Sequence, residues 1–268
     1  MTREAGMTAG PSRVVHVEHC MGTVFSIDIR DPGSWEPAIS AVTGWLHHVD
    51  EVFSTYRPGS DVSRLRRGEL TAEQASPLVA EVLGLCARAQ ADTGGYFTTA
   101  LPGGLDPTGL VKGWAIERAS GILRARGSVN HCVNGGGDIQ LAGEASPGQP
   151  WRVGISDPLD RARLLTVVAG RDVAVATSGL AERGPHIIDP RTGGPAAGLA
   201  SATIVGGSLT LADAYATAAF AMGASAMAWA AGMPGIEALL VSPQGATSRT
   251  PGFTDWESSP GRTGRRAP

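Results

Sequence analysis

A histidine followed by a rigid turn is the strongest candidate for a reactive group in this chain. His186 precedes Ile187 and Ile188, and the sequence then reads Asp-Pro-Arg-Thr-Gly-Gly over residues 189–194. Proline fixes its own backbone and lacks an N–H donor, whereas glycine adopts angles closed to other residues. We therefore predict a short strand at 186–188 that ends in a tight loop and presents the imidazole as a general base. The alternative is a buried, hydrogen-bonded histidine.

A second candidate is a pair of oxygen-bearing side chains in the segment Leu-Ala-Asp-Ala-Tyr-Ala-Thr. Asp213 and Thr217 are four residues apart, so they share one face of a predicted helix. A carboxylate and a hydroxyl are hard oxygen ligands that suit Mg²⁺ or Ca²⁺. Because the helix is otherwise almost wholly apolar, an aspartate there needs a partner. The alternative is a stripe that faces solvent.

Two glycine-rich stretches could approach a ligand closely. In residues 106–114, glycine-rich chain enters a predicted helix, whose first N–H groups and positive dipole end suit an anion, with Lys112 one turn in. In residues 134–138, three consecutive glycines leave backbone bare. The alternative for residues 106–114 is an ordinary capped helix. The alternative for residues 134–138 is a plain hairpin turn.

The periodicity of apolar residues predicts the elements that position these groups. Helices are expected at 36–53, 77–91, 111–126, 209–222 and 224–231. Strands are expected at 24–30, 131–133, 139–141, 151–155, 164–169, 173–176, 202–205 and 236–241. Because strands and helices do not alternate regularly, we predict an α+β domain.

Composition bounds the class of protein. The chain has 268 residues, of which 42% are hydrophobic and 18% charged, and its net charge is −3. A sizeable core is therefore possible, and a nucleic-acid partner is not indicated. The three cysteines are far apart and form no CxxC pair, which argues against a zinc site or a disulfide framework.

The termini complete the expected organisation. Residues 1–12 are predicted to be a loose leader, 13–242 one domain and 243–268 a disordered tail rich in Gly, Ser, Pro and Arg. We find neither an apolar signal core nor an apolar run long enough to cross a membrane. A cytoplasmic location and no transmembrane segment are therefore expected.

The order of these motifs resembles the ApbE family of FAD:protein FMN transferases. The matching segments extend from about Cys20 to Val241. They are Met21-Gly22-Thr23, residues 53–58, 105–114, 134–139, 151–158, 176–179, 186–193 and 212–217. Each segment alone is weak, but the ordered set is specific.

The resemblance implies an ApbE-like domain with mixed sheets, surrounding helices and a central FAD cleft. It implies that Met21 and Tyr56 line the flavin pocket and that Tyr96, Phe97 and Thr98 hold the adenosine end of FAD. Other implied FAD contacts are Asp106, Lys112 and Ile188. It implies that the Gly109 carbonyl ligates a metal together with the side chains of Asp213 and Thr217. It assigns the catalytic role to His186.

The implied reaction transfers FMN from FAD to a threonine or serine hydroxyl of an acceptor protein and releases AMP. Mg²⁺ is the expected cation, with Ca²⁺ or Mn²⁺ as alternatives. Two other functions use the same residues: a Mg²⁺-dependent FAD pyrophosphatase that gives FMN and AMP, and a non-catalytic FAD-binding protein.

Overall fold

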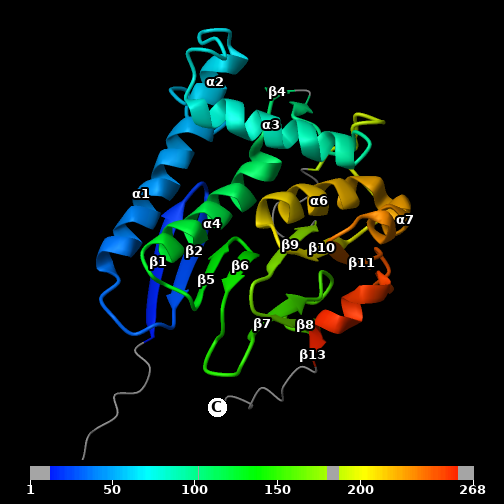
Figure 1. Ribbon diagram of the computed structural model, residues 1–268. Helices are drawn as coiled ribbons and strands as arrows, with labels where there is room; N and C mark the ends of the chain where they lie inside the picture. Colours follow the sequence, from blue (N-terminus) through cyan, green and yellow to red (C-terminus); the bar gives the residue numbers. More distant parts are fainter. Residues whose placement is uncertain (1–12, 102, 180–186, 259–268) are drawn as a thin grey trace, which may run out of the picture.

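A long antiparallel sheet forms the middle layer of the molecule in the computed structural model (Figure 1), which describes residues 13–101, 103–179 and 187–258. Its eight strands run in the order β1-β2-β5-β6-β9-β10-β11-β12, and each neighbouring pair is antiparallel. Their bounds are β1 Val14–Cys20, β2 Thr23–Ile29, β5 His131–Gly135, β6 Asp138–Ala142, β9 Ala174–Gly179, β10 Ser201–Gly206, β11 Ile236–Val241 and β12 Thr247–Arg249.

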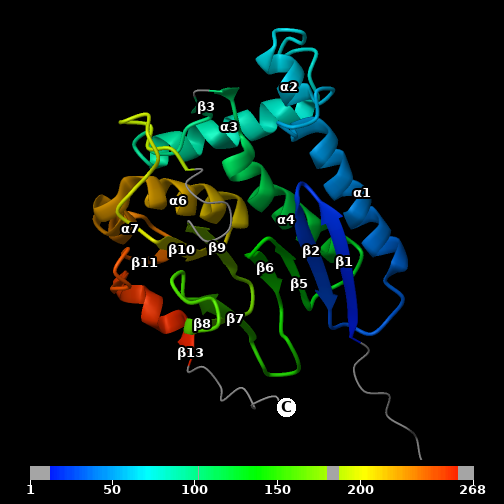
Figure 2. The same ribbon diagram turned by 180° about the vertical axis from the view of Figure 1, so that it is seen from behind.

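Helices cover one face of this sheet. They are α1 (Glu36–Phe53), α4 (Thr108–Ala125), α6 (Leu209–Met222) and α7 (Ala226–Gly232), with α2 (Asp61–Arg66) and α3 (Pro77–Asp92) projecting above them (Figures 1 and 2). A short hairpin, β3 (Ala100–Leu101) and β4 (Gly104–Leu105), lies between α3 and α4 in sequence. The main core, between sheet and helices, includes the fully buried Phe25, Leu46, Ile116 and Phe220.

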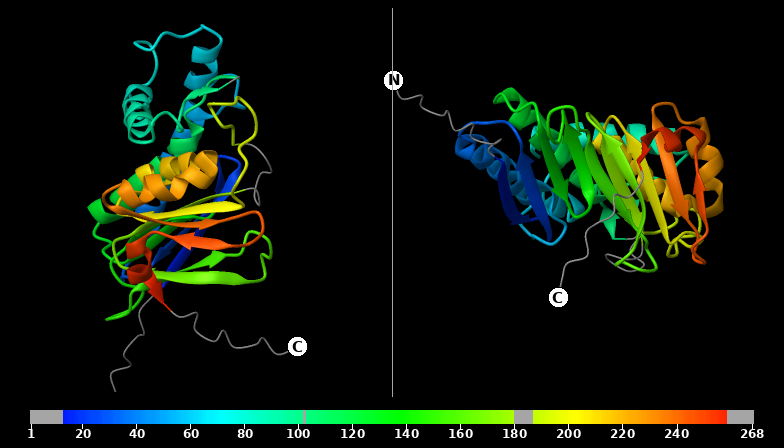
Figure 3. Two further views of the ribbon diagram at one scale, coloured as in Figure 1. Left: turned by 90° about the vertical axis from the view of Figure 1, so that its right-hand side faces the viewer. Right: turned by 90° about the horizontal axis from the view of Figure 1, so that it is seen from below.

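A small sheet packs beneath the other face and completes three layers (Figure 3). Its strands are ordered β13-β8-β7, where β7 is Trp151–Ser156, β8 is Leu164–Gly170 and β13 is Glu257–Ser258. A second apolar cluster joins this sheet to the long one and includes Trp151, Val168, Leu239 and Phe253. The α+β class predicted from the sequence is confirmed.

The predicted helices and strands recur within a few residues of their expected bounds. Helix 36–53, helix 209–222 and strand 236–241 are confirmed at both ends. The sequence analysis missed β1, α2, the β3–β4 hairpin and the elements after residue 242. The predicted domain end at 242 and the disordered tail are wrong as far as residue 258, because β12, the 3₁₀ helix Pro251–Trp256 and β13 belong to the fold.

That C-terminal segment is ordered because apolar side chains anchor it. Phe253 is fully buried in the second cluster, and Trp256 packs against the same cluster. The backbone N–H of Thr250 also donates to the Ala238 carbonyl at 3.0 Å. Residues 1–12 and 259–268 lie outside the described ranges, so the predicted leader and the last ten residues of the predicted tail are not described.

Candidate functional site

The junction of α4 and α6 brings together most of the predicted metal and phosphate residues. Gly113 permits the close approach, because a Cβ at this position would lie 2.5 Å from the Leu209 carbonyl oxygen and 2.7 Å from Cβ of Asp213. Gly109, one turn earlier, lies against Phe97 and Thr217: a Cβ there would be 3.3 Å from the Phe97 ring and 3.8 Å from Oγ1 of Thr217. The contact at Gly113 therefore requires glycine, whereas a Cβ at Gly109 would need only a small shift of the Phe97 ring.

Asp213 is buried at this junction. It is 5% exposed, and its Oδ2 accepts a hydrogen bond of 2.8 Å from the backbone N–H of Gly113. A solvent-facing stripe, the alternative considered from sequence, is therefore wrong for Asp213. In a regular α-helix the Gly113 N–H points to the Gly109 carbonyl. Because Asp213 shares this N–H, the Gly109 oxygen keeps capacity to accept another partner.

Two hydroxyl groups lie close together here, one from Thr217 on α6 itself and one from Ser178 on β9. Thr217 is half-buried, and its Oγ1 lies 3.3 Å from Oγ of Ser178 at the end of β9. The donor set of Asp213, Thr217 and the Gly109 carbonyl consists of hard oxygens, which fits Mg²⁺ or Ca²⁺. Among the described residues, no group of three or more His, Cys, Asp or Glu could hold a metal ion. A site here would therefore use hydroxyl and carbonyl ligands besides one carboxylate.

Lys112 carries the positive charge of the cluster. Its Nζ forms a direct ion pair with Oδ2 of Asp138 and lies 3.7 Å from Oδ1 of Asp213. Asp138 is 1% exposed, and its Oδ1 accepts from the Thr177 N–H at 3.0 Å. Sequence reasoning missed Asp138 and Ser178 as site residues. The sequence does place the Asp138 carboxylate directly after three glycines, but the prediction of a ligand-binding turn used only the glycines.

The Asn134–Asp138 stretch is the hairpin turn between β5 and β6. Gly136 and Gly137 have φ of +59° and +92°, and a Cβ on Gly135 would meet the Phe25 ring at 2.5 Å. The glycines therefore serve the turn and its packing, as the structural alternative supposed. This turn lies beside the β1–β2 turn, where the Gly136 N–H donates to the Val24 carbonyl at 3.2 Å.

Asp106 precedes α4 and tethers its first turn. Its Oδ1 accepts from the Thr108 N–H at 3.0 Å and from the Thr108 hydroxyl at 2.6 Å. Its other oxygen lies 3.2 Å from the Arg66 guanidinium. The N-cap residue Pro107 makes no side-chain capping bond, so Asp106, one residue earlier, satisfies the first N–H of α4, and it already has a cationic partner from α2.

The predicted adenosine-contacting residues differ in exposure. Tyr96 is half-buried beneath the Arg191 guanidinium, which lies 4.1 Å from its ring centroid. Phe97 is 2% exposed and packs in the main core, whereas the half-buried Thr98 accepts from the Ala100 N–H at 3.1 Å. Tyr96 and Thr98 are therefore the accessible members of this group.

The two predicted flavin-contacting residues lie in loops. Met21 occupies the β1–β2 turn with φ of +50° and is half-buried. Tyr56 follows α1 and is 93% exposed. The Tyr56 side chain is therefore almost fully accessible to solvent and is not enclosed by other described residues.

The segment that was predicted to carry the catalytic histidine is only partly described, and His186 lies outside the described residues. Ile187 and Ile188 are not a strand, so that prediction is wrong for them. The chain instead folds back on itself: Ile188 forms an isolated bridge with Pro195, and the Ala196 N–H donates to the Ile187 carbonyl at 2.8 Å. The tight loop is confirmed, with Gly193 at φ of +71°.

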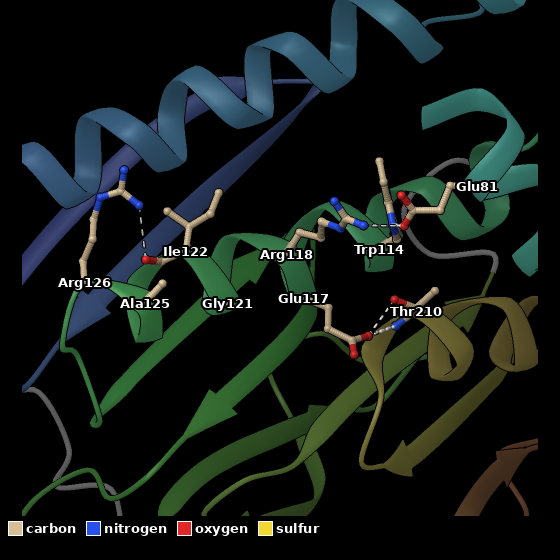
Figure 4. Close-up of a pocket in the computed structure, with 9 residues that line it drawn as sticks. All are labelled: Glu81, Trp114, Glu117, Arg118, Gly121, Ile122, Ala125, Arg126 and Thr210. Carbon is tan, nitrogen blue, oxygen red and sulfur yellow. Dashed lines mark hydrogen bonds and ion pairs between the residues drawn. The ribbon is translucent and has the colours of Figure 1, made fainter. Parts of the chain in front are cut away.

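A surface groove of about 510 Å³ lies over α4, near the first turn of α6 (Figure 4). Its charged groups already pair with neighbours. Glu81 accepts from Arg118 at 2.5 Å, and Glu117 accepts from the Thr210 hydroxyl at 2.6 Å. The lining residues are Glu81, Trp114, Glu117, Arg118, Gly121, Ile122, Ala125, Arg126 and Thr210, none of which belongs to the predicted site. The predicted central FAD cleft stays a prediction.

Comparison with known proteins identifies the fold and the family. The chain superimposes on the solved structure of the flavin transferase ApbE from Vibrio cholerae with a TM-score of 0.80 at 23% identity, covering 91% of this chain and 99% of that one. This similarity establishes the ApbE-like α+β fold. A protein named FAD:protein FMN transferase from Rhodobacter capsulatus is 29% identical over 232 residues, which is 83% of this chain and 42% of that protein.

A relative of the same name from Vibrio cholerae is 34% identical over 129 residues, which is 44% of this chain and 39% of that protein. The chain therefore aligns with less than half the length of these curated relatives. Residues 21–103 and 99–240 match the ApbE family, and the chain belongs to that family. Within the described ranges, no helix is long and apolar enough to cross a membrane.

Proposed function

We propose that this protein transfers the FMN part of FAD to a threonine or serine hydroxyl of an acceptor protein and releases AMP. Family membership supports the reaction class. The observation that carries the proposal for this chain is the α4–α6 junction, where Asp213 bonds the Gly113 N–H and lies 3.7 Å from the Lys112 ammonium, and where Gly109 packs against Thr217. Oxygen ligands next to a cationic side chain suit a diphosphate substrate.

The proposed chemistry is one phosphoryl transfer. The acceptor oxygen bonds to the FMN phosphorus, the bond from that phosphorus to the AMP oxygen breaks, and the acceptor proton passes to His186 as general base. A bound Mg²⁺ would stabilise negative charge on the diphosphate. Asp213, Thr217 and the Gly109 carbonyl would hold it. Ca²⁺ and Mn²⁺ accept the same oxygen donors.

The remaining residues bind the substrate in this proposal. Lys112 faces the phosphates, Tyr96 and Thr98 offer surface to the adenosine, and Met21 and Tyr56 contact the flavin. Asp106, Phe97 and Ile188 support these walls through the contacts described above. The exposed Tyr56 ring is free of protein contacts that would oppose stacking on an isoalloxazine.

The test is a mass measurement on the acceptor. The protein is incubated with FAD, Mg²⁺ and an acceptor domain that carries the threonine target, and AMP is quantified in parallel. A gain of one FMN phosphoester with equal AMP is expected. AMP and free FMN with an unmodified acceptor would instead indicate a pyrophosphatase. Bound FAD without either product would indicate a binding protein.

Two variants assign the residues. Asp213→Ala should abolish Mg²⁺-dependent turnover, whereas Asp255→Ala, an exposed aspartate in the 3₁₀ helix after β12, is the matched control and should not. His186→Ala should bind FAD and slow transfer by roughly 10²–10⁴-fold, the usual contribution of a general base. Full activity of Asp213→Ala would refute the metal assignment.

A further inference from the structure

The first strand of the long sheet leaves one side of its backbone unpaired. Among the described residues, β1 pairs only with β2, through seven residues in an unbroken register (Figure 2). Its sequence contains no proline or lysine and its ladder has no bulge, although these features commonly block pairing at the edge of a sheet. Its one carboxylate, on Glu18, is held by His16 at 3.2 Å and by His47 at 3.1 Å. The free edge of β1 can therefore accept another strand.

The register of the neighbouring strands shows which backbone groups face this free edge. The Gly136 N–H donates to the Val24 carbonyl at 3.2 Å, and the Arg30 N–H donates to the Asn130 carbonyl at 2.8 Å. Because backbone groups alternate in direction along a strand, the even-numbered residues of β2 point toward β5 and its odd-numbered residues point toward β1. Each odd-numbered residue of β2 lies opposite an even-numbered residue of β1. The β1 residues whose N–H and C=O groups face the free edge are therefore Val15, Val17 and His19.

Apolar side chains lie beside these unpaired groups. Val15 and Val17 are 49% and 52% exposed, and Val24 on β2 is 47% exposed. All three project from one face of the sheet, since each odd-numbered residue of β1 lies opposite an even-numbered residue of β2. The other face of β1 carries His16 and Glu18, on the side of α1. Exposed valines beside unpaired backbone favour association with another strand.

The sequence of β1 is complementary to a second copy of itself that runs antiparallel about Val17. In that register Val17 faces Val17, and Val15 faces His19 of the second copy. His16 faces Glu18 of the second copy, so a base lies opposite an acid on both sides of the centre. Registers centred on His16 or Glu18 would instead place two histidines or two carboxylates face to face. The register about Val17 also pairs the whole strand and brings the outward N–H groups of one copy to the outward C=O groups of the other.

We propose that two copies of this chain associate through β1 as a symmetric antiparallel strand pair centred on Val17, which joins their long sheets into one continuous sheet. The contact uses the same residues on both copies, so it is complete in a dimer and leaves no open end. The pairing does not depend on the proposed transfer reaction, because none of the metal or phosphate residues lies on β1.

The first measurement is sedimentation velocity over a concentration series from micromolar to about 1 mM, because a strand pair is a small interface. The wild type should show a reversible monomer–dimer equilibrium. V17K places two ammonium groups opposite each other across the two-fold axis, so its dimer dissociation constant should rise about tenfold or more. L159K is the matched control, since Leu159 is 58% exposed but lies between β7 and β8, away from β1. It should dimerise as the wild type does. Thermal unfolding checks that both variants remain folded.

The second measurement tests the register by oxidative crosslinking. In V17C the two Cα atoms should lie about 5.5 Å apart, within the range for a disulfide, so a covalent dimer is expected. In V15C the two introduced cysteines are four residues out of register, about 13 Å apart, and should not link. The wild type controls for the native cysteines, of which Cys20 and Cys86 are buried and Cys132 is half-buried.

Three outcomes would overturn the inference. One is a wild type that stays monomeric over the whole concentration series. If the Val17 amide of such a monomer were nevertheless protected from hydrogen exchange, another segment of the chain would cover the edge instead. The second is dimerisation of V17K with the wild-type dissociation constant, which would place the contact elsewhere. The third is equal crosslinking of V15C and V17C, which would exclude a register centred on Val17.

Discussion

Replacing Gly113 by alanine should damage both stability and the candidate site. The added Cβ would lie 2.5 Å from the Leu209 carbonyl oxygen and 2.7 Å from Asp213 Cβ. Neither atom is the tip of a flexible side chain, so relief requires movement of the helices. To reach a contact distance of about 3.5 Å, α4 and α6 must separate by about 1 Å.

The free energy of unfolding should fall by about 1.5–5 kcal/mol, the net of three contributions. Overpacking a tight contact costs about 1–3 kcal/mol. Weakening the Gly113 hydrogen bond to the Asp213 carboxylate adds about 1.5–3 kcal/mol, the usual contribution of a bond to a charged group. Against this, alanine is intrinsically favoured over glycine in a helix by about 1 kcal/mol.

Gly121 provides a control in the same helix. It is exposed, and a Cβ there would meet nothing within 4 Å. Gly121→Ala should therefore raise the free energy of unfolding by about 0.5–1 kcal/mol, opposite in sign to Gly113→Ala. Both are measured by urea unfolding, with Mn²⁺ affinity as a second readout. Stability of Gly113→Ala equal to or above that of the wild type would refute this account of the helix junction.

Three further predictions follow from other contacts. Burial lowers the pKa of His131 to about 4; because its unfolded pKa is about 6.5, stability should fall as the pH drops from 6.5 to 4, by at most about 3 kcal/mol. This slope should be absent in His131→Gln, and an unchanged slope would contradict the burial argument. Phe253→Ala should destabilise the protein by about 3–5 kcal/mol in thermal or urea unfolding, since its ring is fully buried; a neutral effect would contradict the anchoring of the C-terminal segment by this ring. Arg191 stacks on Tyr96, so a double-mutant cycle of Arg191→Ala and Tyr96→Leu should give a coupling of about 0.5–1 kcal/mol in unfolding, and additive effects would remove the contact.

Periodicity in the sequence was sufficient where one face of an element is buried and the other is not. The α1 helix follows this rule, with Val42, Leu46 and Val49 buried at helical spacing, and its bounds were predicted correctly. The β1 strand also alternates, but half-exposed and exposed residues alternate along it, so its apolar signal is weak. The α2 helix has six residues, too few for a period to show.

Contacts between distant segments were beyond the reach of local patterns. Composition predicted disorder after residue 242, yet two aromatic side chains, together with backbone hydrogen bonds, hold residues 250–256 against the sheet. The resemblance implied Lys112 and Asp213, but the contact between Lys112 and Asp138 depends on packing among β6, β9 and α4. The two isoleucines after His186 predicted a strand. The turn at 189–194 instead brings the following residues back against them, so Ile188 pairs with Pro195 and Ile187 bonds to Ala196.

The hydrogen bond between Gly113 and Asp213 joins residues separated by 100 positions in the chain. During synthesis α4 emerges long before α6, and at about 5–20 residues per second the interval is roughly 5–20 s. The glycine face of α4 is uncovered throughout that time, because the Gly113–Asp213 contact cannot form before α6 is made. A ribosome-bound fragment that ends before α6 should therefore expose this face, and burial of Gly113 reports that the two halves of the chain have met.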